Sequence, residues 1–323
     1  MRKNVSLRRH LFSAMFVVLP VLLGFPAPTV AQTVFFAENF DNNNFASRGW
    51  YDMSGGGGTI DSSNSAPGSA ASWNSHWAQG GASPVAGVPG RHKFPDSDTV
   101  YVSFWIKLGT ASTTWQGSGL PWHPHMMYLL TNADGDYVGP AWSNLEFLIE
   151  PNGFTPRLGA TDGKRINTGQ LGVNLLGSGT SHAIAGGNGN QNGTSGYYSN
   201  GDGTYSNGTF WDSTTTMFRN DTWHHVEVFV AMNSVVAGVP QRDGIVKMWI
   251  DGALVVDEAN VYLRSAQFAT QKFNQFLLAP YLVGSSGGSP IAQDLWIDDL
   301  LVADQPPAPQ AGIPAPTNLR VVR

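Results

Sequence analysis

Two histidines flank a proline near the middle of the sequence, in the segment GSGLPWHPHMMYLLTN (residues 117–132). His123 and His125 are separated by one residue, so in a strand their side chains point to the same face. An imidazole titrates near neutral pH and is therefore suited to act as a general base. A His-x-His pair on a strand can also hold zinc or copper, but the other histidines are too scattered to complete such a site. The adjacent Trp122 offers an aromatic surface on which a ligand can stack.

Two glutamates form a second candidate pair, in the segment LEFLIEPNG. Glu146 and Glu150 share a face of a predicted strand, and retaining glycosidases use two carboxyl groups about 5–5.5 Å apart. Four residues along a regular strand span roughly 13 Å, which is too far unless the side chains converge. We therefore keep a retaining glycosidase as the weaker interpretation of this pair.

The composition restricts the classes of partner. The chain has 323 residues, a formal net charge of −5 and 13% charged residues. Nucleic-acid binding needs a basic surface, so we expect no nucleic-acid partner. With no cysteine, the fold must be stabilised by an ordinary core rather than by disulfides. Abundant glycine, asparagine, serine and tryptophan suit β-structure and surfaces that contact sugars.

The N-terminus has the pattern of a secretory signal peptide. A basic stretch precedes a short apolar run and a small-x-small site at Thr29-Val30-Ala31. We expect residues 1–31 to be removed, the rest to be secreted or periplasmic, and no membrane span to remain after cleavage. An uncleaved N-terminal anchor is the alternative.

Alternating strand patterns dominate the remaining chain. The segments DTVYVSFWIKL, TWHHVEVFVAMN and DGIVKMWIDGALVVD each place aliphatic residues on one face, and an Asp-Gly turn in the last predicts a hairpin. The opposite faces mix aromatic with charged residues, which indicates a sheet face that binds a ligand; covering loops are the alternative. The predicted substrate-binding residues are Trp105, Lys107, Trp122, Glu227, Phe229, Lys247 and Trp249.

We predict one domain over residues 32–304. Residues 159–212 are rich in glycine and asparagine, which predicts a long loop region beside a groove. Residues 305–323 form a proline-rich C-terminal tail.

Several segments together resemble a known superfamily. ENFD near the start, the strand DTVYVSFWIKL, the Trp-His strand TWHHVEVFVAMNS and the closing WIDDLLVAD are similar to concanavalin-A-like, laminin-G-like jelly rolls. They also resemble bacterial polysaccharide lyases of the alginate, glucuronan and heparin lyase type. The resemblance implies an all-β jelly-roll sandwich of two antiparallel sheets, a fold that hosts lectins, glycosidases and lyases alike.

The lyases of this superfamily line a concave sheet with an arginine-bearing strand, a Gln-x-His strand and a late strand with lysine and tyrosine. The resemblance therefore implies a catalytic set whose counterparts here are Arg91, His123, His125, Lys272, Asn274 and Tyr281. A cation or amide would neutralise a uronate carboxylate, for which Arg91, Lys272 and Asn274 are the candidates. His125 would take the C5 proton and Tyr281 would protonate the leaving oxygen. Tyr128 has the opposite strand parity to His125 unless a bulge intervenes, so we prefer Tyr281.

Related jelly rolls often pin their first and last strands with calcium. The resemblance implies that Glu38, Asp298 and Asp299 are the matching carboxylates. We expect this metal to be structural, with no cofactor required for catalysis.

These observations predict a secreted, monomeric protein whose partner is a polysaccharide. The favoured activity is a lyase that cleaves an acidic, uronate-containing glycan by β-elimination. A non-catalytic, lectin-like carbohydrate-binding module is the alternative.

Overall fold

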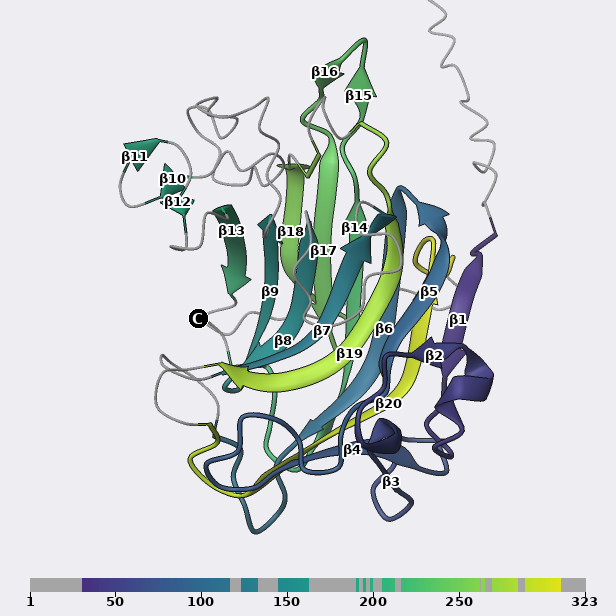
Figure 1. Ribbon diagram of the computed structural model, residues 1–323, viewed down its shortest axis with the longest axis vertical. Helices are drawn as coiled ribbons and strands as arrows, with labels where there is room; N and C mark the ends of the chain where they lie inside the picture. Colours follow the sequence, from purple (N-terminus) through teal and green to yellow (C-terminus); the bar gives the residue numbers. More distant parts are fainter. Residues whose placement is uncertain are drawn as a thin grey trace, which may run out of the picture. The chain divides into compact units, whose positions relative to one another are not determined.

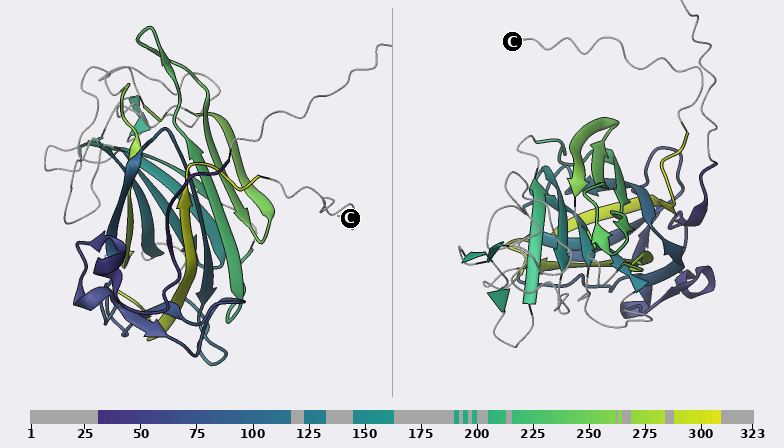
Figure 2. Two further views of the ribbon diagram at one scale, coloured as in Figure 1. Left: turned by 90° about the vertical axis from the view of Figure 1, so that its right-hand side faces the viewer. Right: turned by 90° about the horizontal axis from the view of Figure 1, so that it is seen from above.

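The computed structural model describes residues 31–116, 123–132, 145–162, 190–191, 194–195, 198–199, 205–212, 216–261, 263–264, 269–283 and 288–308. The chain divides into two units, Met1–Ala31 and Gln32–Arg323, and every described strand lies in the second. Two large antiparallel sheets make up this unit (Figures 1 and 2).

The first sheet holds the strands whose alternation is clearest in the sequence. In spatial order it contains β18 (Ala253–Val261), β17 (Gly244–Ile250), β14 (Trp223–Ala231), β6 (Thr99–Leu108), β20 (Gln293–Ala303), β4 (Ser72–Trp77) and β3 (Thr59–Asp61). The first strand of the unit, β1 (Val34–Glu38), pairs with the last part of β20.

The second sheet carries the histidine pair and faces the viewer in Figure 1. In spatial order it contains β12 (Tyr198–Ser199), β13 (Tyr205–Asp212), β9 (Thr155–Asp162), β8 (Glu146–Asn152), β7 (His123–Thr131), β19 (Phe273–Val283), β5 (Gly90–Ser97) and β2 (Trp50–Tyr51). The smaller elements are the hairpins β10 (Asn190–Gln191) with β11 (Thr194–Ser195) and β15 (Val235–Val236) with β16 (Val239–Pro240), and the 3-10 turns η1 (Phe45–Arg48) and η2 (Gly55–Gly57).

The aliphatic faces of both sheets meet in one core. On β6 the alternate residues from Val100 to Leu108 are at most 1% exposed, and the valines of β14 and alternate residues of β17 (Val246, Met248 and Ile250) are buried beside them. From the other sheet, Phe147, Phe273 and Phe276 join the same cluster. The predicted all-β sandwich is confirmed, because two large antiparallel sheets enclose one apolar core.

The predicted hairpin between β17 and β18 is present. Asp251 and Gly252 both have positive φ, 51° and 77°. Two central residues with positive φ are the requirement of a type I′ turn.

The expectation of a long loop region over residues 159–212 is wrong at both ends, and most of the residues between lie outside the described part of the chain. Strand β9 extends to Asp162, and β13 pairs with it from Asn207 to Asp212. Trp211 of β13 packs in the core, where its ring lies parallel to that of Phe147 with the centroids 6.4 Å apart. The glycine-rich composition of the surrounding segment does not predict this buried position. Residues 1–30 of the predicted signal peptide (1–31) and residues 309–323 of the predicted tail (305–323) lie outside the described residues. Within the described parts of the chain, no helix is both long and apolar enough to span a bilayer.

Candidate functional site

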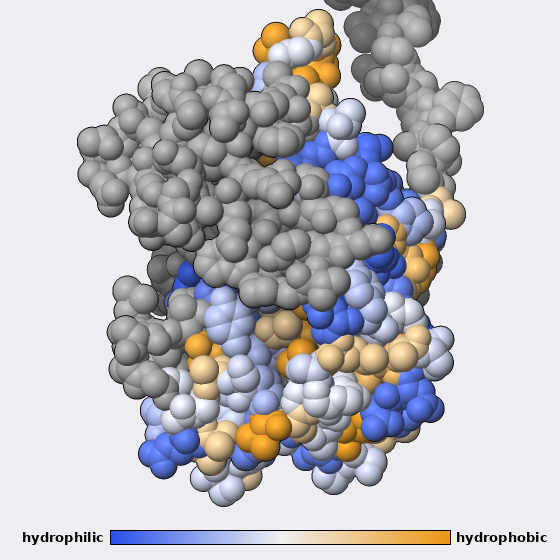
Figure 3. Space-filling model, viewed as in Figure 1, coloured by the Kyte–Doolittle hydropathy of each residue, from blue (hydrophilic) through white to orange (hydrophobic). Residues whose placement is uncertain are grey.

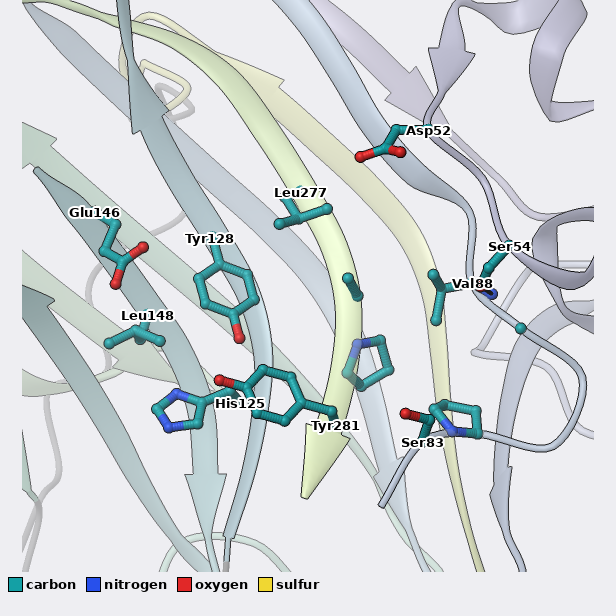
Figure 4. Close-up of a pocket in the computed structure, with 14 residues that line it drawn as sticks. Asp52, Ser54, Ser83, Val88, His125, Tyr128, Glu146, Leu148, Leu277 and Tyr281 are labelled. Carbon is teal, nitrogen blue, oxygen red and sulfur yellow. Dashed lines mark hydrogen bonds between the residues drawn. The ribbon is translucent and has the colours of Figure 1, made fainter. Parts of the chain in front are cut away.

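A pocket of about 560 Å³ opens on the outer face of the second sheet (Figure 4). Its walls come from β7, β8 and β19 on one side, and from the segments around residues 52–54 and 83–88 on the other. The described residues that line it are Asp52, Ser54, Ser83, Pro84, Gly87, Val88, His125, Tyr128, Glu146, Leu148, Leu277, Ala279, Pro280 and Tyr281.

Three side chains that can move protons meet in this pocket. The imidazole of His125 stacks on the ring of Tyr281 with the centroids 5.3 Å apart, and on the ring of Tyr128 at 6.3 Å. Figure 4 shows both tyrosine hydroxyls pointing toward the space beside the imidazole. Tyr281 is 42% exposed and Tyr128 only 3%, so Tyr281 is the more accessible to a ligand.

Tyr128 shares the pocket with His125, so the alternative of an intervening bulge holds and the expected opposite parity does not. Met126 and Met127 both face the core, so the alternation of β7 breaks between His125 and Tyr128. At the same place the register between β19 and β7 shifts, between Leu278 and Tyr281. A bulge of this kind redirects side chains, and here it brings both tyrosines to one pocket.

Both tyrosines are held in the phenol form. Burial is the main cause that raises the pKa of Tyr281, the carboxylates of Glu146 and Glu150 add to it, and the Tyr128 hydroxyl opposes it. Burial, the Tyr281 hydroxyl and the same carboxylates raise the pKa of Tyr128 well above its ordinary value. At neutral pH each hydroxyl is therefore a proton donor.

A row of polar side chains crosses four strands at the level of His125. Tyr281 of β19 is in register with His125 of β7. The imidazole Nδ1 lies 3.2 Å from Oε2 of Glu150 on β8, and Oε1 of Glu150 lies 3.2 Å from Nε of Arg157 on β9. Glu150 is 1% exposed and does not line the pocket, so it is placed to act on His125 and not to contact a sugar.

An apolar row lies next to the polar one. Leu277, Tyr128 and Leu148 are in register on β19, β7 and β8 and, with Leu130, form a second hydrophobic cluster on the pocket side of the sheet. Figure 3, seen from the same side as Figure 1, shows patches of apolar surface between polar ones on the lower part of this face. The row can pack against the apolar face of a sugar ring.

Arg91 lies at the edge of the site and does not line it. The side chain is fully buried, and its Nε donates to Oδ2 of Asp52 at 3.0 Å. Asp52 is part of the pocket wall. The predicted arginine is thus brought next to the pocket wall, but its side chain is buried and paired with a carboxylate.

Lys272 and Asn274 are not brought to the pocket. The ammonium group of Lys272 lies 3.2 Å from Asp98, beyond the end of β7. Asn274 is 8% exposed and lies where the register of β19 shifts. The expectation that the late strand supplies a cation and an amide to the site is wrong for both positions, because only the other half of β19, around Tyr281, reaches the pocket.

The predicted substrate-binding residues lie on the other sheet. Trp105, Lys107, Glu227, Phe229, Lys247 and Trp249 occupy the outer faces of β6, β14 and β17. The whole core separates this face from the pocket, so the two sets cannot line one groove. The expectation of a shared face is wrong because strand periodicity does not reveal which sheet a strand joins.

Hydrogen bonds, ion pairs and ring contacts link the side chains of this outer face to one another. Tyr101 donates to Glu227 at 2.6 Å, and Lys247 lies 2.7 Å from Asp257. Trp105 contacts the ring of His225, with centroids 5.1 Å apart. Trp122 lies outside the described residues, and His123 begins β7 in register with Val283 of β19.

The predicted calcium ligands have other contacts. Both oxygens of Glu38 accept N–H donors, from Phe40 at 2.9 Å and from Arg48 at 2.7 Å. Asp298 accepts from Ala66 at 2.8 Å, and Asp299 is exposed. Among the described residues no three histidine, aspartate or glutamate side chains gather into a metal site, and the calcium stays a prediction.

Sequence reasoning missed Asp52 and the apolar row. Asp52 follows a two-residue strand and has a positive φ of 56°, and nothing in the local pattern marks such a residue as a pocket wall. The sequence does contain an indication of the apolar row. Tyr128 and Leu130 are two positions apart in β7, which indicates a second apolar face on the outer side of this strand.

No protein-family model and no curated protein matches the sequence. Among solved structures, the chain is similar to the marine PL-14 alginate lyase from Aplysia kurodai, with a TM-score of 0.54 and 15% identity over 84% of this chain and 100% of that one. It is also similar to the endo-β-1,4-glucuronan lyase of the fungus Trichoderma reesei, with a TM-score of 0.45 and 15% identity over 84% and 96% of the chains. Alginate lyase vAL-1 from Chlorella virus aligns with a TM-score of 0.47 and 10% identity over 73% and 85%. The match with the Aplysia kurodai enzyme shows that the chain has a jelly-roll fold of the kind found in that lyase.

Proposed function

We propose that this protein is a polysaccharide lyase that cleaves an acidic, uronate-containing glycan by β-elimination. The observation that carries the proposal is the stacked pair of His125 and Tyr281 in the pocket, 5.3 Å between ring centroids. The fold supports it, because a protein named as an alginate lyase aligns over its full length.

The reaction needs a base and an acid close to one sugar ring. His125 removes the C5 proton, a C4–C5 double bond forms, and the C4–O bond to the leaving sugar breaks. Tyr281 gives its proton to that oxygen. Solvent then takes the proton from the imidazolium and restores the phenol, so the enzyme ends as it began.

The protonation state of Tyr281 suits the role of acid. Burial and the carboxylates of Glu146 and Glu150 raise its pKa, so the proton is retained until the leaving oxygen develops charge. Tyr128, whose pKa is raised further, stays a phenol beside it and can hydrogen-bond the tyrosinate that forms.

Two of the groups predicted to neutralise the uronate carboxylate are engaged elsewhere. Arg91 is fully buried and paired with Asp52, and Lys272 pairs with Asp98. The signal-like N-terminus supports export of the protein, and we propose that the glycan is met outside the cytoplasm.

The test is ultraviolet absorbance of the unsaturated product, measured with a panel of uronate polysaccharides with calcium present. We expect a rise on one substrate and none with the His125→Ala variant. Circular dichroism of the variant checks that it folds. A rise that persists in His125→Ala would exclude His125 as the base.

A carbohydrate-binding module without catalysis is the alternative. Half-buried aromatic residues beside charged groups on β6, β14 and β17 favour it, because such faces stack on sugars and hydrogen-bond their hydroxyls. A flat absorbance trace over the whole panel, with glycan binding retained, would establish this alternative.

A further inference from the structure

A buried carboxylate lies directly behind the imidazole of His125. Glu150 is 1% exposed, on the face of β8 that it shares with Glu146 and Leu148. Burying a carboxylate is costly unless the group is paired. Glu150 has two such partners, Nδ1 of His125 and Nε of Arg157, each at 3.2 Å.

Strand register holds this arrangement in place. Glu150 and Arg157 are directly opposite each other on the paired strands β8 and β9. The side chain of Arg157 is only 13% exposed, so the ion pair is largely removed from water. Arg157 is thus positioned to hold one oxygen of the carboxylate while the other faces His125.

We propose that Glu150 is a positioning residue that keeps the proton of neutral His125 on Nδ1 and so presents Nε2 to the substrate. The inference rests on the proposed lyase function. Glu150 itself does not line the pocket, so it acts through His125. A carboxylate at Nδ1 also stabilises the imidazolium that forms when Nε2 takes the C5 proton.

Other charged and titratable groups share this environment. They are Tyr128 and His125 on β7, Tyr281 on β19, Arg157 on β9 and Glu146 on the strand of Glu150 itself. The charge of Glu150 also raises the pKa of Tyr281. One buried group therefore contacts the base and also disfavours loss of the proton from the acid.

The test is Glu150→Gln, which keeps the size and one amide oxygen but removes the charge. We expect kcat to fall by roughly 10²-fold, in the range of general-base effects, with KM changed by less than about 3-fold. The basic limb of the pH–rate profile should move to lower pH, because Tyr281 loses one cause of its raised pKa. Unchanged kcat and pH profile would overturn the inference, as would a rise in KM alone.

The matched control is Asp98→Asn, which breaks another carboxylate–arginine pair, 2.6 Å from Arg264, away from the pocket. Its kcat and pH profile should not change. If Glu150→Gln fails to fold, Glu150→Asp keeps the charge but withdraws it from Nδ1, and kcat should still fall. Wild-type kcat in a folded Glu150→Asp would then overturn the inference.

A spectroscopic readout separates this inference from the lyase proposal. Nitrogen NMR of His125 should show the Nδ1–H tautomer in the wild type and a loss of that preference in Glu150→Gln. If the wild type cleaves no polyuronate, the lyase proposal fails while this spectrum still decides the role of Glu150. The same tautomer in both proteins would overturn the positioning role even in an active enzyme.

Discussion

An aromatic ring and a carboxylate both contact the imidazole of His125. An aromatic ring, Tyr281, stacks on it from the pocket, and a carboxylate, Glu150, contacts Nδ1 from the sheet. The ring contact restricts rotation of the imidazole and the carboxylate determines which nitrogen carries the proton. A base prepared in this way loses little entropy when the substrate arrives.

At the residue scale, Tyr281→Phe tests the assignment of the acid. The substitution removes only the hydroxyl, so we expect stability to be nearly unchanged and kcat to fall about 10²-fold. Initial rates of ultraviolet absorbance, measured on the substrate that the wild type cleaves, check the result. Tyr51→Phe is the control, since its hydroxyl donates to Gln275 at 3.2 Å without lining the pocket, and it should keep the wild-type rate. Equal rates for Tyr281→Phe and the wild type would assign the acid to another group.

At the scale of elements, the pocket depends on irregular stretches of regular strands. The break in alternation at Met126 and Met127 and the register shift near Tyr281 both lie in the middle of the second sheet. An ideal β7 would present either His125 or Tyr128 to the pocket, but not both. The bulge is thus the feature that assembles the three proton-transferring groups.

Substitution of two glycines tests how β2 and the segment that follows it shape the site. Gly90 and Gly252 both have positive φ. An added Cβ at Gly90 would lie 2.3 Å from the backbone carbonyl oxygen of Tyr51, whereas an added Cβ at Gly252 would meet nothing within 4 Å. We expect Gly252→Ala to cost about 1 kcal/mol of unfolding free energy from backbone strain alone. Gly90→Ala should cost more and should also lower kcat, because it displaces the backbone of Asp52 in the pocket wall. Urea unfolding and initial rates compare the two variants; equal losses with unchanged rates would contradict a role for β2.

The strands themselves could be predicted from the sequence, because alternation along β6, β14 and β17 is a local property. Their membership of one sheet or the other could not, since strand order depends on pairings between distant segments. Trp249 and His125 both belong to outer faces and look equivalent in a periodicity argument. Only the pairing of β17 with β14, and of β7 with β19, places them on opposite sides of the molecule.

At the scale of the whole molecule, the two sheets present different outer surfaces. One carries the pocket, with its apolar and polar rows. The other carries half-buried aromatic residues interlinked with charges, such as Lys107, which lies 2.6 Å from Asp221 and over the ring of Trp296. The core separates the two surfaces, so a substitution on one makes no direct contact with the other.

The pH dependence of stability gives a test at this scale. Burial raises the pKa of Asp298 to about 6, although N–H groups of Ala66 and Asp299 and the Ser69 hydroxyl oppose the shift. The folded state therefore favours the protonated form. The resulting stabilisation is complete below about pH 4 and is lost as pH rises through 6, for a total of about 3 kcal/mol at most.

The comparison of wild type with Asp298→Asn isolates this contribution. Asparagine cannot titrate, so the unfolding free energy of the wild type relative to the variant should fall between pH 4 and pH 7. Urea unfolding at several pH values measures the difference, and any constant cost of the amide cancels from its slope. A difference that stays flat over this range would show that Asp298 is not protonated in the folded protein near pH 5.

The pairing of β1 with β20 has a consequence for how the molecule is made. Thr33 and Asp304 lie at the beginning and at the end of the chain segment that forms the sandwich. They hydrogen-bond to each other although they are 271 positions apart in the sequence. A contact between such distant residues gives the fold a high contact order, which slows folding. The first strand of a growing chain must wait for the last, so the sandwich cannot close before synthesis has passed β20.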